Sequence, residues 1–180
     1  PLPECTYETA TGQNFRLVAD IYAAQDSQER SVPILYDKKT QRIVSNESAD
    51  IVRMLGLWAH ELGSNLADKD RPNLYPQSKP LRTEIDALNH DIYGAINNGA
   101  YKAGFSSDQM IYESAFKAYF DMLYKLDHLL ADGRHFLTGN TLTEADLRLF
   151  PTLYRHDPVY YLRMKLNAAK ILDYPHLWRW

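Results

Sequence analysis

The sequence predicts an α/β unit followed by an all-α unit, and three observations lead to this fold class. Two short β-type runs stand close together in the first third of the chain. Apolar residues recur at helical spacing from residue 81 onward, and the stretch 61–80 before them gathers Pro, Gly, Asn and Asp. Such patterns are typical of a hairpin, a set of packed helices and a linker, respectively.

Composition narrows the class of protein. The chain has 180 residues, 45% of them hydrophobic and 24% charged, with a formal net charge of -3. This balance is typical of a globular protein and argues against a nucleic acid or an anionic membrane as partner. The single cysteine, Cys5, excludes an internal disulfide and favours a reducing compartment, so we expect a cytoplasmic protein.

In the first unit, the pattern predicts a hairpin between two helices. Near-helical apolar spacing predicts a short helix over 14–24, and the runs 34–36 and 42–44 predict two antiparallel strands joined by the polar loop DKKTQ. A further helix should begin after Ser45-Asn46 and pack on the hairpin. Because isolated hairpins are only marginally stable, this unit should need more strands than the chain contains.

The helical unit begins with two long helices that we expect to pair. The first is predicted to stop at Asn97-Asn98-Gly99. The second is predicted to start at a capping box of Ser106 and Gln109 and to end near Asp132-Gly133. Their apolar stripes consist of Leu81, Ile85, Leu88, Ile92 and Ile96 in the first helix and of Phe116, Tyr119, Leu123, Leu126 and Leu130 in the second.

A capping box marks the start of a third helix. In TLTEADLRLF, the Thr143 hydroxyl can accept from the Asp146 amide while the Asp146 carboxylate accepts from the Thr143 amide. Glu144 and Asp146 are therefore better explained as helix-start residues than as a catalytic carboxylate pair. Pro151 should fall in the second turn of this helix or just past it, where it should produce a kink.

Val32-Pro33 is the first candidate binding element. Proline at the start of a strand removes a donor from the ladder. A cis bond there would turn the amide and carbonyl of Val32 outward, free to pair with an extended peptide-like ligand. From this pair of residues alone, the common alternative is an ordinary trans proline on an edge strand.

Glu47 and Ser48 form the second candidate element. They stand at the first turn of the helix expected after the hairpin, where unpaired amides and the positive end of the helix dipole favour a ligand carboxylate. Ser48 could add a hydroxyl, and Glu47 could accept from a ligand ammonium group. The alternative is a plain helix start with Ser45 or Asn46 as N-cap. Together, the two elements would suit a small zwitterionic peptide.

An ordered series of motifs resembles a known family. VPILYDKK, IVSNES, IVRML, LRTEIDALNHDIYGAINNGAYKAGF, LTEADLRLF and DPVYYLRMK follow one another along the chain. The series resembles the glutathionyl-hydroquinone reductases, the Xi-class relatives of omega glutathione transferases. The resemblance implies part of a thioredoxin-like domain over 1–62, a linker over 63–80 and a helical glutathione-transferase C-terminal domain over 81–180.

The resemblance also implies roles in binding glutathione. Val32 would pair through its backbone with the cysteinyl part of the tripeptide, next to a cis peptide bond at Pro33. Glu47 and Ser48 would hold the γ-glutamyl end.

Two tyrosines match those that face the quinol substrate in the family. They are Tyr101 in NNGAYKAGF and Tyr160 in DPVYY. On the bare sequence, either ring would more often belong to the core or the surface, because the chain has 13 tyrosines.

The nucleophile of the family is not in this sequence. Members use a cysteine in a CPWAH motif whose thiolate attacks the sulfur of a glutathionyl-hydroquinone, and a second glutathione clears the mixed disulfide. LWAHE at 57–61 follows the hairpin and lacks the cysteine, and Cys5 is followed by Thr6 rather than by proline. We expect Cys5 to be an ordinary thiol and the nucleophile to lie upstream of Pro1.

The resemblance thus implies an enzyme that reduces S-glutathionyl-hydroquinones to hydroquinones, with glutathione as co-substrate. We expect no metal, because the histidines are scattered without ligand spacing. The alternative is a thiol-free relative that binds glutathione conjugates or serves as a scaffold. By resemblance to glutathione transferases, we expect a homodimer.

Overall fold

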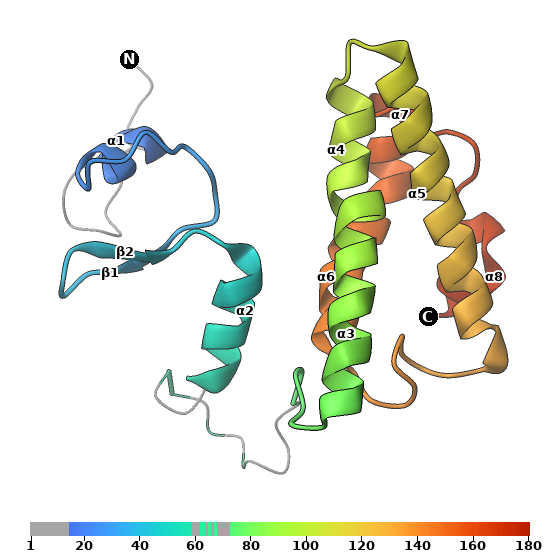
Figure 1. Cartoon of the computed structure of the whole chain (residues 1–180), viewed down its shortest axis with the longest axis horizontal. Helices are drawn as coiled ribbons and strands as arrows, with labels where there is room; N and C mark the ends of the chain where they lie inside the picture. The colour runs from blue at the N-terminus through green and yellow to red at the C-terminus, as the bar shows by residue number, and fades with distance from the viewer. Residues whose placement is uncertain (1–14, 59–61, 64, 66, 68–72) are drawn as a thin grey trace. The chain divides into compact units, whose positions relative to one another are not determined.

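The computed structural model describes residues 15–58, 62, 63, 65, 67 and 73–180 (Figure 1). The chain divides into two compact units, Pro1–Leu66 and Ala67–Trp180. Within the described residues, the first unit contains both named strands, and the second consists of helices and their connections. The predicted fold class, α/β followed by all-α, is confirmed.

Two antiparallel strands lie between two helices in the first unit (Figure 1). The elements are α1 (Val18–Ala23), β1 (Leu35–Asp37), β2 (Arg42–Ser45) and α2 (Ser48–Leu57). Their order and types confirm the sequence prediction. The Asp37 carboxylate closes the connecting loop, because it accepts from the Lys39 amide (2.8 Å) and from the Thr40 hydroxyl (2.7 Å).

A side chain that follows α1 holds the hairpin. The Gln25 Oε1 atom accepts from the Ile43 amide of β2 at 3.0 Å. A strand at the edge of a sheet has backbone amides that form no hydrogen bond to the neighbouring strand. Each such amide needs another acceptor when it is shielded from water. This hydrogen bond therefore satisfies one such amide and ties the end of α1 to the sheet.

The second unit is built from helices that pack side by side. Its elements, in chain order, are α3 (Lys79–Ile92), η3 (Tyr93–Asn97), α4 (Asn98–Phe105), α5 (Gln109–Leu129), η4 (Leu130–Asp132), α6 (Glu144–Arg155), η5 (His156–Tyr160), α7 (Tyr161–Arg163), η6 (Ile171–Asp173) and α8 (Pro175–Arg179). The turns η3 and η5 are π-helical, and η4 and η6 are 3-10 helices. Figure 1 shows α3 and α4 end to end, with α5 returning alongside them.

The apolar stripes predicted for the two long helices form the core of this unit. The members that are no more than 1% exposed are Ile85, Ile92, Ile96, Tyr119, Leu123, Leu126 and Leu130. Burying one such side chain stabilises the fold by roughly 1.5–3 kcal/mol relative to leaving it in water. The predicted pairing of the two helices is confirmed, since η3 and α4 pack against α5.

The predicted stop at Asn97-Asn98-Gly99 is wrong, because the helix continues through these residues to Phe105. The Asn98 amide bonds to the Tyr93 carbonyl, which is the wider π-helical pattern. The Asn97 side chain donates to the Arg148 carbonyl of α6 at 2.8 Å. Asn97, a residue type that commonly ends helices, here makes a contact between helices instead.

The predicted capping box of Ser106 and Gln109 is also wrong. Asp108 is the N-cap of α5, and its Oδ1 atom accepts from the amides of Met110 (2.8 Å) and Ile111 (3.0 Å). Ser106 has a different task, since its hydroxyl accepts from the Asp108 amide at 3.0 Å and so shapes the turn before the helix. A carboxylate at the N-cap is also favoured by the helix dipole.

The capping box at the start of α6 is confirmed. The Asp146 Oδ2 atom accepts from the Thr143 amide (3.0 Å) and the Thr143 hydroxyl (3.1 Å). Its Oδ1 atom accepts from the Leu137 amide (2.9 Å) and from the indole of the final residue, Trp180 (3.0 Å). Asp146 is 2% exposed, so one buried carboxylate joins the helix start, the preceding turn and the C-terminus. Pro151 lies inside α6, which continues to Arg155.

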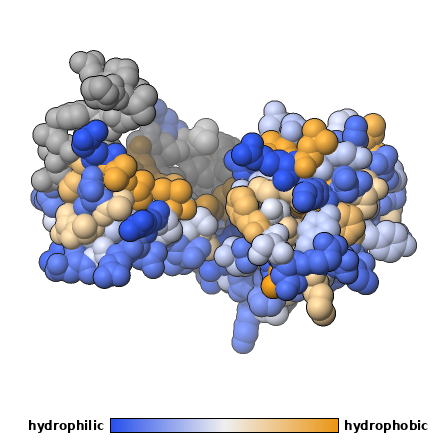
Figure 2. Space-filling view, turned by 90° about the horizontal axis from the view of Figure 1, so that it is seen from above, coloured by the Kyte–Doolittle hydropathy of each residue, from blue (hydrophilic) through white to orange (hydrophobic). Residues whose placement is uncertain are grey.

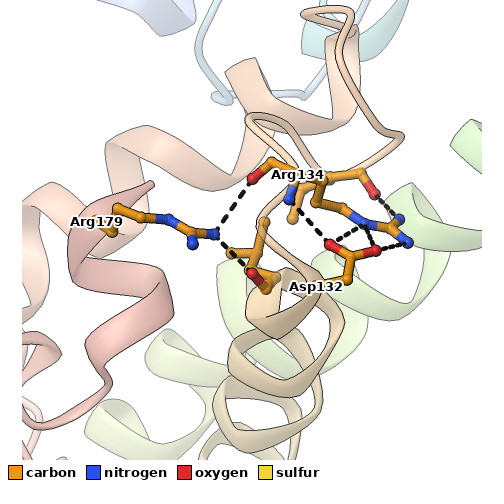
Figure 3. Close-up of polar contacts among 5 residues, drawn as sticks. Asp132, Arg134 and Arg179 are labelled. Atoms are coloured by element: carbon orange, nitrogen blue, oxygen red, sulfur yellow. Dashed lines mark hydrogen bonds and ion pairs between the residues drawn. The ribbon is translucent and has the colours of Figure 1, made fainter.

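Helices α5 and α8 cap each other. The Asp127 carboxylate of α5 accepts from the amides of His176 (2.8 Å) and Leu177 (2.9 Å) in the first turn of α8. In return, the Arg179 guanidinium of α8 donates to the Leu130 carbonyl (2.6 Å) and to the Arg134 carbonyl (3.2 Å), as Figure 3 shows. Charged groups thus satisfy the unpaired amides of one helix and a carbonyl at the end of the other.

The surface of the second unit mixes hydrophilic and hydrophobic residues on the face seen in Figure 2. Among the helices in the described parts of the chain, none combines the length and the apolar character that crossing a bilayer requires.

Replacing Asp146 by alanine should lower the free energy of unfolding by about 3 kcal/mol, because two amides and an indole N–H would lose their buried acceptor. Chemical denaturation of the variant measures this change. Asp121→Ala is the matched control, since Asp121 is exposed and forms an ion pair with Lys117 on the surface of α5, and its effect should stay under about 1 kcal/mol. Equal effects of the two substitutions would contradict the assignment of Asp146 as an anchor.

Candidate glutathione and quinol site

The Val32–Pro33 peptide bond is cis, as the resemblance implied, and the trans alternative is wrong. Val32 is 70% exposed, and within the described part of the chain neither its amide nor its carbonyl has a hydrogen-bond partner. Pro33 is also exposed and lies just before β1. An extended peptide could therefore pair with the Val32 backbone as an added strand does.

Ser31 connects this loop to the start of α2. The Tyr22 hydroxyl of α1 donates to the Ser31 carbonyl (2.9 Å), and the Asn46 side-chain amide donates to the Ser31 hydroxyl (3.1 Å). Because Asn46 directly precedes Glu47, the two predicted binding elements come together within the first unit. Sequence reasoning missed this connection, since single polar residues so far apart along the chain leave no periodic pattern.

Glu47 is the N-cap of α2, and Ser48 is its first residue. The alternative with Ser45 or Asn46 as N-cap is wrong, because the Glu47 carboxylate itself accepts from the Ala49 amide at 3.2 Å. Ser45 lies one step earlier, and its hydroxyl accepts from the Glu47 amide at 3.1 Å.

Both Glu47 and Ser48 are exposed at the start of a helix of 10 residues. The amides of a first helical turn have no partner inside the helix, and Glu47 satisfies one of them. The Ser48 amide and hydroxyl face no partner within the described residues and are open to a ligand carboxylate. One oxygen of the Glu47 carboxylate likewise remains open to a ligand ammonium group.

Tyr101 and Tyr160 lie side by side in the second unit, although 59 positions separate them in the sequence. Their hydroxyl oxygens are 3.0 Å apart, and their rings meet edge to face with centroids 5.8 Å apart. Tyr101 belongs to α4 and is 42% exposed, whereas Tyr160 ends η5 and is 2% exposed. The exposed ring of Phe105 lies 5.9 Å from Tyr101 and widens this aromatic surface.

A buried histidine supports the π turn that ends at Tyr160. His156 opens this turn, its Nε2 atom donates to the Ala169 carbonyl (3.0 Å), and its Nδ1 atom accepts from the Tyr119 hydroxyl (2.9 Å). Burial lowers the pKa of His156, while the Ala169 carbonyl and Asp157 act in the opposite direction. The neutral ring suits both partners. No sequence pattern pointed to this histidine.

Burial raises the pKa of the Tyr160 phenol, and the neighbouring Tyr101 hydroxyl raises it further, against a smaller opposing effect of Arg155. Tyr160 therefore keeps its proton near neutral pH. A pair of phenols carries two protons, and their mutual hydrogen bond uses one of them. The second proton can be donated to an oxygen of a third group.

The remaining predictions concern thiols and metals. Cys5 and part of LWAHE lie outside the described residues. Among the residues that the structure describes, no three side chains of His, Cys, Asp or Glu form a group that could hold a metal ion.

Comparison with known proteins places these features in context. Residues 109–180 match the family described as glutathione S-transferase, C-terminal domain. The chain is 46% identical over 148 residues to the glutathionyl-hydroquinone reductase YqjG of Escherichia coli and 44% identical over 149 residues to the glutathionyl-hydroquinone reductase PcpF of Sphingobium chlorophenolicum. The alignments cover 82% and 83% of this chain but 43% and 45% of those proteins, so the chain spans less than half their length.

Solved structures agree with the sequence comparisons. The glutathione-bound structure of YqjG from Escherichia coli K-12 is similar with a TM-score of 0.82 and 41% identity, over 94% of this chain and 53% of that one. The glutathione transferase Xi from Phanerochaete chrysosporium gives a TM-score of 0.86 and 40% identity, over 100% of this chain and 59% of that one. By sequence and by fold, the chain is similar to these proteins over about half of their length, and residues 109–180 match the glutathione S-transferase C-terminal domain.

Proposed function

We propose that this chain forms the glutathione-binding and quinol-binding parts of an enzyme that reduces S-glutathionyl-hydroquinones to hydroquinones. The observation that carries the proposal is the pair of phenol groups, Tyr101 and Tyr160, whose hydroxyls lie 3.0 Å apart beside the exposed ring of Phe105. The name of the two bacterial relatives supports the substrate class.

The first unit binds glutathione in this proposal. The exposed backbone of Val32 next to cis-Pro33 pairs with the cysteinyl part, and Glu47 and Ser48 hold the γ-glutamyl end. A γ-glutamyl group carries both a carboxylate and an ammonium group. The carboxylate suits the first-turn amides and the Ser48 hydroxyl, and the ammonium group suits the Glu47 carboxylate. The hydrogen bonds that Ser31 accepts from Tyr22 and Asn46 support the assignment, since they hold the two binding elements together.

The second unit binds the aromatic part. One phenol proton is used in the hydrogen bond between Tyr101 and Tyr160, and the other is donated to a quinol oxygen, while the exposed rings of Tyr101 and Phe105 pack against the quinol. When the ring carbon gains an electron pair, negative charge develops on the quinol, and a hydroxyl already aimed at its oxygen stabilises that charge. The exposed Tyr101 hydroxyl makes this donation, and the buried Tyr160, whose raised pKa keeps its phenol protonated, donates the shared proton to Tyr101.

The reaction also needs a thiolate. A cysteine thiolate attacks the sulfur of the conjugate, a sulfur–sulfur bond forms, the sulfur–carbon bond breaks, and its electron pair goes to the ring carbon, which takes up a proton. The thiolate of a second glutathione then attacks the mixed disulfide, which releases oxidised glutathione and restores the cysteine thiolate. The proposal requires a cysteine followed by a proline elsewhere in the gene product, because the 180 residues contain only Cys5, followed by Thr6.

We also infer a homodimer in the cytoplasm. The dimer follows from the resemblance of the motif series to glutathione transferases, and the single cysteine among these 180 residues suits a reducing compartment. Sedimentation of the gene product as a monomer at micromolar concentration would contradict the dimer.

The full-length gene product, incubated with a glutathionyl-hydroquinone and no free glutathione, should release hydroquinone once and retain one glutathione on one cysteine. Mass spectrometry of the intact protein and its peptides measures this adduct. Cys5→Ser should leave the adduct unchanged. Binding of the conjugate without any thiol adduct would favour a thiol-free binding protein instead.

Tyr101→Phe and Tyr160→Phe should each lower kcat for aromatic conjugates by about tenfold, the size of one lost hydrogen bond to a developing charge. The KM for glutathione should stay within about twofold, because the tripeptide binds the first unit. Steady-state kinetics of the gene product test both values, with Tyr124→Phe on the exposed face of α5 as control. Parallel losses in kcat and in glutathione affinity would show that the rings are merely structural.

Glu47→Gln should raise the KM for glutathione about tenfold and leave thermal stability unchanged. The amide oxygen of glutamine can still cap α2 through the Ala49 amide, but it no longer offers a charge to the ligand ammonium group. Asp50→Asn, in the same helical turn, is the matched control and should have little effect. If Glu47 only capped the helix, the glutamine variant would bind glutathione as the parent does.

A further inference from the structure

Gly104 permits an unusually close approach between α4 and the chain after α7. A Cβ atom added to Gly104 would overlap the Met164 Sδ atom and would lie 2.8 Å from both Cβ and Cγ of Met164. Real Cβ contacts essentially never fall below 3.0 Å. The absence of a side chain at position 104 therefore lets the two segments meet at this distance.

The contact is one turn away from each phenol of the proposed quinol site. Gly104 follows Tyr101 by three positions on the same helix. On the other side, the amides of Met164 (3.1 Å) and Leu166 (3.2 Å) both donate to the Tyr160 carbonyl, so Met164 is bound to the turn that ends at Tyr160. Any shift of Met164 relative to α4 is therefore passed to Tyr160.

Met164 cannot avoid a larger residue at position 104 by a change of rotamer alone. The Sδ atom can swing aside, but the Cβ atom is fixed to the backbone and Cγ is only one bond further out. Met164 is also 5% exposed within the core of the unit, where neighbouring atoms restrict it. A side chain at position 104 would push the two backbones apart.

We propose that Gly104 and Met164 are positioning residues that set the spacing between the Tyr101 and Tyr160 hydroxyls. The role in turnover rests on the proposed function, but the spacing itself does not. Two hydroxyls 3.0 Å apart share a hydrogen bond at the long end of the usual O–H···O range, so a further separation takes the pair outside that range. Gly104 thus controls whether the phenols act as a pair.

The first test compares Gly104→Ala with Gly94→Ala in the full-length gene product. Gly94 lies in η3 of the same continuous helix, and a Cβ there meets nothing within 4 Å, so it controls for the general effect of alanine. For NMR, the protein is labelled with carbon-13 at the ζ carbon of tyrosine. The resonances of Tyr101 and Tyr160 are assigned by their loss in the variants Tyr101→Phe and Tyr160→Phe. Gly104→Ala should move both resonances and lower kcat for aromatic conjugates about 10- to 100-fold at unchanged KM for glutathione. Gly94→Ala should do neither.

The second test is rescue. Met164→Gly removes all three atoms that collide with the new Cβ, so the double variant Gly104→Ala/Met164→Gly should regain the parental resonances and most of the lost kcat. Should Gly104→Ala not fold, Met164→Ala removes Cγ and Sδ without adding bulk, and it should loosen the pair and move the same two resonances.

Two results would overturn the proposal. One is a Gly104→Ala protein with parental tyrosine resonances, whatever its thermal stability. The other is a Met164→Ala protein in which the two resonances and kcat are unaffected. If the resonances respond as expected but the parent protein shows no turnover of glutathionyl-hydroquinones, the spacing role stands and the proposed function fails.

Discussion

The helical unit depends most on the hydrogen bonds that the buried carboxylate of Asp146 accepts. This carboxylate accepts from the amides of Leu137 and Thr143 and from the indole of Trp180, so it fixes the start of α6, the turn before it and the C-terminus at one point. Because α6 runs directly into η5, the position of Tyr160 follows from an anchor at the opposite end of the same helical stretch. A carboxylate at the start of this helical stretch thus helps to fix the position of the phenol at its end.

The second phenol is positioned by polar contacts between helices. Asn97 donates to the Arg148 carbonyl (2.8 Å), and Asn89 donates to the buried Glu144 carboxylate (2.8 Å), so the continuous stretch from α3 to α4 is fixed along α6. Tyr101 lies just beyond the π turn of this stretch, and Tyr160 ends the π turn that follows α6. Such turns change which face a residue occupies by one position, and they often occur at functional sites.

Most of the fold could be predicted from the sequence, because apolar spacing depends only on local helical and strand geometry. The helix ends were harder to predict. Asn97 looked like a stop signal, but its side chain is used by Arg148 of a distant helix, and Asp108 caps α5 where Ser106 was expected. The motifs identified the candidate site residues. The hydrogen bond between Asn46 and Ser31 and the buried His156 could not be predicted, because no pattern in the nearby sequence indicates them.

The central claim is that the exposed backbone of Val32 in the first unit binds glutathione and that Tyr101 and Tyr160 in the second unit bind the quinol. The most direct measurement is a crystal structure of the full-length gene product, with its nucleophilic thiol blocked, bound to a glutathionyl-hydroquinone. The account predicts hydrogen bonds from the tripeptide backbone to Val32 and a quinol oxygen within hydrogen-bond distance of a phenol hydroxyl of the pair. A quinol ring bound away from both tyrosines would contradict it.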